Sequence, residues 1–185
     1  MNRFNDLTNF YVIGISYKNA DLHTRGKFNL SKSQKIKILK KAKSLEIDEI
    51  LINNTCNRTE IYSFAKSSSV IVNLLCENSD GDHETFKTLG YIFENTEAIN
   101  HIFKVGTGLD SQILGDFEII GQLKNSFSLS KDNHLIGSFM ERLTNSVIQA
   151  SKRIKNETKI SSGATSVAYA AVQFIINEVD NVSNK

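Results

Sequence analysis

The spacing of apolar positions in the first half of the chain alternates between the period of a strand and that of a helix. Short runs rich in β-branched and aromatic residues predict strands at residues 11–16, 49–53, 60–65 and 89–93. Apolar positions three or four apart predict a helix that begins at a capping box of Ser31 and Gln34 and ends near Leu45, and a second one around residues 70–75. The order β-α-β-β-α-β is that of the ferredoxin-like split βαβ arrangement, so we expect an α+β fold.

After the fourth predicted strand the apolar positions keep helical spacing. Thr96 is placed to cap a first helix, and a glycine-bearing loop follows at residues 106–115. Three further helices are predicted, at residues 117–130, 135–158 and 165–179. We therefore expect one domain over residues 1–160, ferredoxin-like to about residue 94 and helical after it, followed by the start of a linking helix at residues 161–185.

The composition is typical of a globular protein, with 40% hydrophobic and 23% charged residues in a chain of 185. The net charge of +2 does not predict nucleic-acid binding, so a basic surface would have to be local. No stretch approaches the ~18 apolar residues of a spanning helix, and the N-terminus lacks a signal-peptide pattern. We expect a cytoplasmic protein with reduced thiols, in which Cys56 and Cys76 form no disulfide and Cys76 is a packing residue.

Cys56 lies at the centre of a polar heptapeptide, residues 54–60, between two predicted strands. A cysteine that serves packing normally has apolar neighbours, whereas this one is surrounded by hydroxyls, amides and the guanidinium of Arg58. A nearby cation favours the thiolate, which is the nucleophilic form. The segment predicts a nucleophilic cysteine at the tip of a hairpin, and the alternative is an ordinary turn in which the cysteine is incidental.

Several segments match one known family in the same order along the chain. They are residues 12–20, residues 54–60 with Thr55-Cys56-Asn57-Arg58, residues 101–124 with Gly108-Leu109-Asp110-Ser111 and Gly121-Gln122-Leu123-Lys124, and the helical segments 150–158 and 166–171. Together they resemble glutamyl-tRNA reductase, from its opening strand to the helices that lead out of its catalytic domain. The resemblance covers nearly the whole chain.

The resemblance implies that glutamyl-tRNA is reduced with NADPH to glutamate-1-semialdehyde, at the start of the route to 5-aminolevulinate, porphyrins and other tetrapyrroles. It implies that Cys56 attacks the activated carbonyl, releases the tRNA and holds a thioester for hydride transfer, which suits a thiolate. It also implies that His101 assists catalysis and that polar side chains bind the substrate. The polar residues carried over in this way are Thr55, Asn57, Arg58, Ser111 and Gln122.

Arg58 is the expected partner of the substrate carboxylate, because its planar fork can hold two oxygens at once. The alternatives are an exposed arginine in a turn for Arg58 and a half-buried histidine at a helix start for His101. The chain departs from the family at Asp116-Phe117-Glu118, where the family usually has Glu-Pro-Gln. We expect these three positions to contribute to the substrate pocket with altered contacts, since a carboxylate at Glu118 would repel an anionic substrate unless it points away.

No strand–G-x-G-x-x-G–helix unit is found, because no predicted strand precedes Gly106-Thr107-Gly108. NADPH is therefore expected to bind a domain that this chain does not include, and a dimerisation domain is expected to be missing as well; no metal is expected. The family further implies a homodimer, transfer of the aldehyde to glutamate-1-semialdehyde aminomutase, and no membrane partner.

Two other functions stay open: a tRNA-binding or regulatory module without turnover, and a thiol-dependent esterase of glutamyl-tRNA. Two basic runs could contact tRNA phosphates or simply be solvated helix faces. The first run consists of Lys32, Lys35, Lys37, Lys40, Lys41 and Lys43, and the second of Arg142, Lys152, Arg153 and Lys155.

Overall fold

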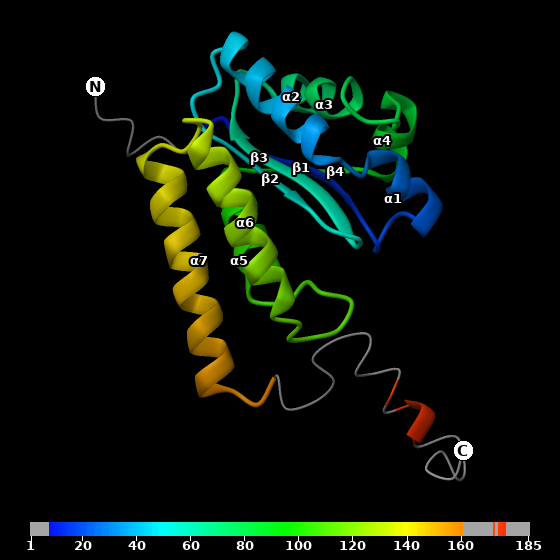
Figure 1. Cartoon of the computed structure of the whole chain (residues 1–185), viewed down its shortest axis with the longest axis vertical. Helices are drawn as coiled ribbons and strands as arrows, with labels where there is room; N and C mark the ends of the chain where they lie inside the picture. The colour runs from blue at the N-terminus through cyan, green and yellow to red at the C-terminus, as the bar shows by residue number, and fades with distance from the viewer. Residues whose placement is uncertain (1–7, 161–171, 173, 177–185) are drawn as a thin grey trace.

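The core of the protein is a four-stranded antiparallel sheet with helices on both faces (Figure 1). The computed structural model describes residues 8–160, 172 and 174–176. The strands are β1 (Phe10–Ser16), β2 (Ile50–Asn54), β3 (Arg58–Phe64) and β4 (Tyr91–Glu94). Their spatial order is β2-β3-β1-β4, and every neighbouring pair is antiparallel. The predicted α+β fold with four antiparallel-paired strands is confirmed, and the strand order is that of a split βαβ arrangement.

One set of helices covers one face of the sheet and a second set covers the other (Figure 1). The first set is α2 (Lys32–Ser44), α3 (Ser68–Cys76) and α4 (His83–Leu89), and the second is α5 (Asn95–Gly106), α6 (Glu118–Asp132) and α7 (Ser138–Glu157). The short α1 (Leu22–Phe28) connects β1 to α2. The sequence did not predict α1 or α4, each of which is seven residues long and begins at an aspartate cap.

The start of α2 agrees with its sequence signal, whereas the start of α5 does not. The Ser31 hydroxyl accepts from Gln34 N, and Ser31 N donates to the Gln34 side chain at 2.8 Å, which forms the predicted capping box. Thr96 does not cap α5, because the helix begins one residue earlier, at Asn95, directly after β4. Asn95 turns the chain with a φ of 53°, a conformation that asparagine tolerates better than most residues.

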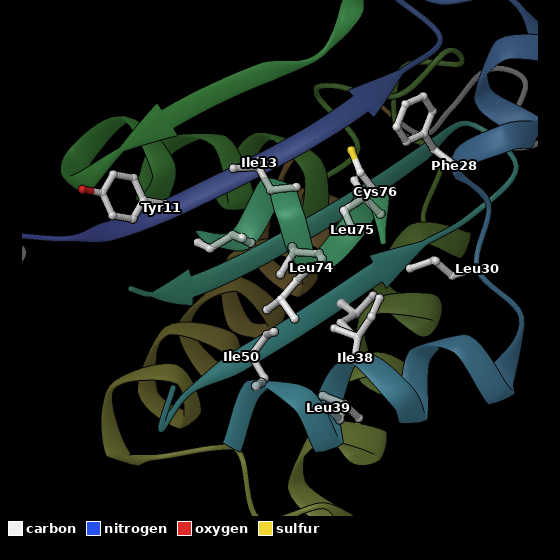
Figure 2. Close-up of a cluster of buried hydrophobic side chains, with 14 of the residues drawn as sticks. Tyr11, Ile13, Phe28, Leu30, Ile38, Leu39, Ile50, Leu74, Leu75 and Cys76 are labelled. Atoms are coloured by element: carbon white, nitrogen blue, oxygen red, sulfur yellow. The ribbon is translucent and has the colours of Figure 1, made fainter. Parts of the chain in front are cut away.

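Alternation along the strands sends side chains into two separate apolar clusters. Ile13 and Ile61 belong to the cluster under α2, α3 and α4, which Figure 2 shows with Cys76 among its members. Val12 and Tyr62, one residue away in each strand, belong to the cluster under α5, α6 and α7. Because both faces are covered, polar side chains in the strand interiors are forced into buried positions.

The predicted last helix at residues 165–179 and the linker at 161–185 fall outside the described residues, apart from residues 172 and 174–176, which are helical. Among the helices that the structure describes, none combines the length and apolar character needed to cross a membrane.

Candidate active site

Cys56 lies at the tip of the tight turn that joins β2 to β3. The side chain is exposed and the thiol is free, as the sequence predicted, whereas Cys76 is buried. Thr55 closes the turn, because its backbone N donates to Arg58 O at 2.8 Å and its hydroxyl accepts from the backbone N of Asn57 and of Arg58 at 3.2 Å each. The thiol is therefore presented on a turn that the neighbouring hydroxyl holds in shape.

Neighbouring segments brace this turn from outside. Arg25 of α1 donates from Nε to the Cys56 carbonyl at 3.3 Å and from Nη1 to the Ala20 carbonyl at 2.7 Å. Tyr17 N donates to the Asn57 carbonyl at 2.9 Å. The cation bonded to the Cys56 backbone is thus Arg25, which the sequence did not single out.

Arg58 points away from the turn and into the buried interface between the sheet and the loop that follows α5. It is 3% exposed. Its Nη1 donates to Glu60 Oε1 and to Asp110 Oδ2, both at 3.0 Å, and its Nη2 donates to the Asp110 carbonyl. Burial alone would lower the pKa of Arg58, but the charge and hydrogen bond of Glu60, together with the nearby Tyr91 and Tyr62, raise it. Lys18, half exposed, forms an ion pair with the same Asp110 carboxylate.

Glu60 is a fully buried carboxylate at the centre of this interface, and five side chains donate to it. Oε1 accepts from Arg58 and from the Tyr91 hydroxyl at 2.5 Å, and lies 2.6 Å from His101 Nε2. Oε2 accepts from Asn53 Nδ2 at 3.0 Å and from the Tyr62 hydroxyl at 2.8 Å. Burial would raise the pKa of Glu60, but the Arg58 charge and these hydrogen bonds lower it, so the carboxylate is ionised inside the protein.

Two of the Glu60 contacts, those with Asn53 and Tyr91, follow from strand register. Asn53, Glu60, Gly14 and Tyr91 lie in one row across β2, β3, β1 and β4. Gly14 has no side chain, so the Tyr91 hydroxyl can reach Glu60 across it. Burial, and then the charge of Glu60, raise the pKa of Tyr91 and of Tyr62, which keeps both hydroxyls available as donors.

His101 lies on α5, and its side chain faces Glu60 in this row. Its side chain is 11% exposed, and the rings of Tyr91 and Phe93 lie 5.3 and 4.9 Å from its ring. The nitrogen that faces Glu60 is Nε2. The structure therefore joins His101 to Arg58 through Glu60, and the two predicted site residues meet in one buried cluster.

The remaining predicted site residues lie on the loop after α5 and on the first turns of α6. Ser111 is half-buried and directly follows Asp110, the residue that contacts Arg58. Asp116 Oδ1 accepts from the Glu118 N–H at 2.9 Å and thereby starts α6. The Phe117 ring lies 5.6 Å from Lys155 Nζ of α7. Glu118 and Gln122 are exposed, one helical turn apart.

The loop is closed on itself by a backbone bond from Gly115 N to the Gly108 carbonyl at 3.0 Å. Gly115 has a φ of 81°, which favours glycine. Asp110 on this loop is the point of attachment to the Cys56 side of the sheet, through Arg58 and Lys18. The loop thus brings Ser111 towards the thiol end of the sheet, while Asp116, Phe117 and Glu118 have local structural contacts.

Comparison with known proteins identifies the family. The sequence model described as glutamyl-tRNAGlu reductase, N-terminal domain, matches residues 13–158. The chain belongs to the glutamyl-tRNA reductase family.

Relatives named glutamyl-tRNA reductase support this family assignment. The protein of Christiangramia forsetii is 57% identical over 176 residues, which is 95% of this chain and 42% of the relative. The protein of Aquifex aeolicus is 34% identical over 166 residues, 88% of this chain and 41% of the relative. The chain therefore spans about two fifths of the length of these members of the family.

A solved structure agrees on the fold. Glutamyl-tRNA reductase from Methanopyrus kandleri superimposes with a TM-score of 0.74 at 23% identity, over 92% of this chain and 40% of that one. At this identity the likeness shows the fold alone.

Four charged residues of the site were not recognised from the sequence: Lys18, Arg25, Glu60 and Asp110. A signal for Glu60 was present, because it and Arg58 lie two apart in one strand, so both side chains must point to the same face. The roles of Arg25 and Asp110 depend on tertiary contacts with residues 31 and 52 positions away, which spacing cannot reveal.

The described residues do not fit NADPH. Gly106 and Gly108 lie at the end of a helix, and the sheet has only antiparallel pairs, whereas a dinucleotide fold places its glycines between a parallel strand and a helix. In the same part of the chain, no group of three or more His, Cys, Asp or Glu side chains is placed to hold a metal ion.

Proposed function

We propose that this chain carries the acyl-transfer step of a glutamyl-tRNA reductase. The observation that carries the proposal is an exposed, free thiol at Cys56, on a braced turn beside a buried cluster of charges, in a member of this family. Reduction with NADPH, formation of glutamate-1-semialdehyde for tetrapyrrole synthesis, a homodimer and transfer of the aldehyde to an aminomutase belong to the same proposal.

The acyl-transfer step needs an exposed thiol and an activated ester. The Cys56 thiolate attacks the carbonyl carbon of the glutamyl ester, and an Sγ–C bond forms. The bond from that carbon to the terminal ribose oxygen breaks, and the oxygen leaves with the electron pair and takes a proton. The glutamyl group then remains on Cys56 as a thioester, which is still reactive enough to accept a hydride.

Arg58 is proposed to bind the side-chain carboxylate of the glutamyl group, next to Ser111. In the free protein the Asp110 carboxylate and carbonyl fill this side of the guanidinium. Binding therefore requires Asp110 to release one of its contacts, and the half-exposed Lys18 can hold Asp110 while it does so. Thr55 and Asn57 keep the turn in place, and Gln122 is exposed at the edge of the same region.

His101 is proposed to act mainly by fixing Glu60, because its Nε2 lies 2.6 Å from that carboxylate. A fixed Glu60 in turn fixes Arg58. Asp116, Phe117 and Glu118 are proposed to shape the pocket through the start of α6, where the side chain of Glu118 is exposed to solvent. The altered motif is thus compatible with an anionic substrate.

Acylation of Cys56 is the direct test. The 185-residue chain is incubated with radiolabelled glutamyl-tRNA, and the adduct is located by mass spectrometry of the peptides. We expect a glutamyl thioester on Cys56, slow release of free glutamate by water, and no aldehyde on addition of NADPH, because the described residues do not position a cofactor. Cys56→Ser should abolish the adduct, since a serine hydroxyl is scarcely ionised.

The result also separates the two other functions. Tight tRNA binding without an adduct would indicate a binding module and remove the proposed acyl transfer. An adduct on Cys56 that turns over rapidly to free glutamate would indicate an esterase.

A further inference from the structure

A continuous stretch of the chain, residues 22–45, contains eight lysines and arginines and no acidic residue. It comprises α1, the connecting residues and α2. Six of the eight are the lysines of α2, a helix of only 13 residues. This stretch therefore concentrates positive charge in a protein whose net charge is +2.

The lysines of α2 face solvent because the other side of the helix is buried. Ile38, Leu39 and Ala42 pack into the core. Lys32, Lys37, Lys40, Lys41 and Lys43 are exposed, and Lys35 is half-buried. Lysines one helical turn apart, such as Lys37 and Lys41, repel each other and weaken a helix. The helix has six lysines and no acidic residue in its own sequence, so a polyanionic partner would relieve their mutual repulsion more than water does.

This basic surface begins at the nucleophile. Asn54, two residues before Cys56, accepts from Leu30 N at 3.0 Å and donates to the Leu30 carbonyl and to the Asn29 side chain. These bonds fix the residues just before α2 against the Cys56 turn. From there α2 extends away from the turn for about 20 Å, at 1.5 Å per residue. Arg25 of α1, bonded to the Cys56 carbonyl, adds a further cation beside the turn.

The second basic run, on α7, is used differently. Arg153 donates to both oxygens of Glu157, at 3.2 and 3.3 Å, and Lys155 lies over the Phe117 ring. On α2, Lys41 forms an ion pair with Glu77, and it is the one lysine of this helix that does so within the part of the chain that the structure describes. The cations of α2 are thus more available to an outside anion than those of α7.

We propose that the exposed lysines of α2 bind the phosphates of the acceptor arm of tRNA, whose aminoacylated 3′ end reaches Cys56. The inference rests on the proposed acyl transfer from glutamyl-tRNA. An RNA strand whose end lies at the thiol must leave the site along the protein surface, and α2 provides a row of cations that starts there. Phosphate contacts of this kind supply affinity and orientation, independent of base sequence.

Two triple variants with the same change in charge test the surface. The test variant is Lys32→Gln/Lys37→Gln/Lys40→Gln on α2, and the control is Lys66→Gln/Lys87→Gln/Lys131→Gln, which are also exposed. Binding of deacylated tRNA is measured over a range of salt concentrations, with circular dichroism to show that each variant is folded. The test variant should bind about tenfold or more weakly, and its slope of log K against log salt should fall by about two to three.

The control should stay within about twofold of the unmodified chain, and the corresponding Lys→Arg triple on α2 should retain binding because arginine keeps the charge. Equal weakening in both Gln triples, no weakening, no tRNA binding by the unmodified chain, or preference for anionic lipid vesicles over tRNA would overturn the proposal. The mass of Cys56 after incubation of the unmodified chain with glutamyl-tRNA reports separately on acyl transfer, so failure of this surface and failure of the proposed function give different results.

Discussion

Gly14 on β1 and Glu60 on β3 lie opposite each other, and the space left by the missing side chain of Gly14 is filled by the Glu60 side chain and the Tyr91 hydroxyl. A Cβ atom at Gly14 would lie 2.8 Å from both Glu60 Cγ and Tyr91 Oη. Glu60 in turn holds Arg58 and His101. A glycine in the opening strand is thus a condition for the buried cluster that supports the candidate active site.

Gly14→Ala should therefore lower stability by about 1–3 kcal/mol, because the added methyl group overpacks a covered sheet face, and should separate Tyr91 from Glu60. The free energy of unfolding is measured by urea denaturation. Gly121→Ala is the matched control, since a Cβ atom there meets nothing within 4 Å. Alanine is the better helix former, so this control should gain up to about 1 kcal/mol. Equal effects of the two changes would show that Glu60 and Tyr91 can move aside for a methyl group at Gly14 without loss of stability.

Glu60→Gln should destabilise the protein by about 3–5 kcal/mol, because Arg58 would lose a buried ionised partner. Glu60→Gln should also remove the part of the pH dependence of stability that comes from the Glu60 carboxylate. The folded pKa of Glu60 is lowered from an ordinary value of 4.5, so its contribution to stability is present above that pH and is lost as the pH falls towards the folded value.

The unmodified chain should thus lose more stability than Glu60→Gln between about pH 6 and about pH 3.5. Asp21 and Asp82, whose pKa values are lowered by hydrogen bonds from Thr24 and Thr85, are present in both proteins and cancel in the comparison. Parallel pH profiles for the two proteins would mean that the pKa of Glu60 is the same in the folded and the unfolded chain, and would contradict the lowered folded value.

The sequence predicted the fold well because apolar positions repeat with different periods in strands and in helices. Covering of both sheet faces also helped, because it makes the strands rich in apolar residues. Helices with a clear apolar stripe, such as α2 and α7, were found close to their true limits. The seven-residue α1 and α4 were missed because one buried phenylalanine each, Phe28 and Phe86, gives no periodic pattern.

The site was predicted less completely, for a physical reason. Cys56 could be recognised because its neighbours in sequence are also its neighbours in space. The charge balance of Arg58 could not, because its partner Asp110 comes from a loop 52 residues away, and strand alternation shows only that Arg58 and Glu60 share a face. Arg58 therefore belongs to a buried ion-pair network whose acidic members come from β3 and from the loop after α5.

Arg58→Lys tests the planar fork of this residue. Lysine cannot reproduce donation from Nη1 and Nη2 to Glu60 and Asp110, so we expect a loss of about 1–3 kcal/mol in stability and a large fall in Cys56 acylation by glutamyl-tRNA. Arg153→Lys is the matched control: that arginine donates from two nitrogens to the two oxygens of Glu157, but it is exposed, and its replacement should leave stability and acylation nearly unchanged. Unchanged acylation in Arg58→Lys would remove Arg58 from the carboxylate site.

Cys56 should react with iodoacetamide at least about ten times faster than Cys76, because alkylation requires an accessible thiolate. Cys56 is exposed on its turn, whereas Cys76 is 7% exposed in the apolar core and burial raises the pKa of its thiol to about 11. The rates are compared by peptide mapping after short exposures to the reagent. In concentrated urea the two cysteines should react at similar rates, which shows that the difference arises from the fold and not from neighbouring residues in the sequence. Equal rates in the folded protein, or faster labelling of Cys76, would contradict a nucleophilic role for Cys56, since a thiol that small reagents cannot reach cannot attack the far larger glutamyl-tRNA.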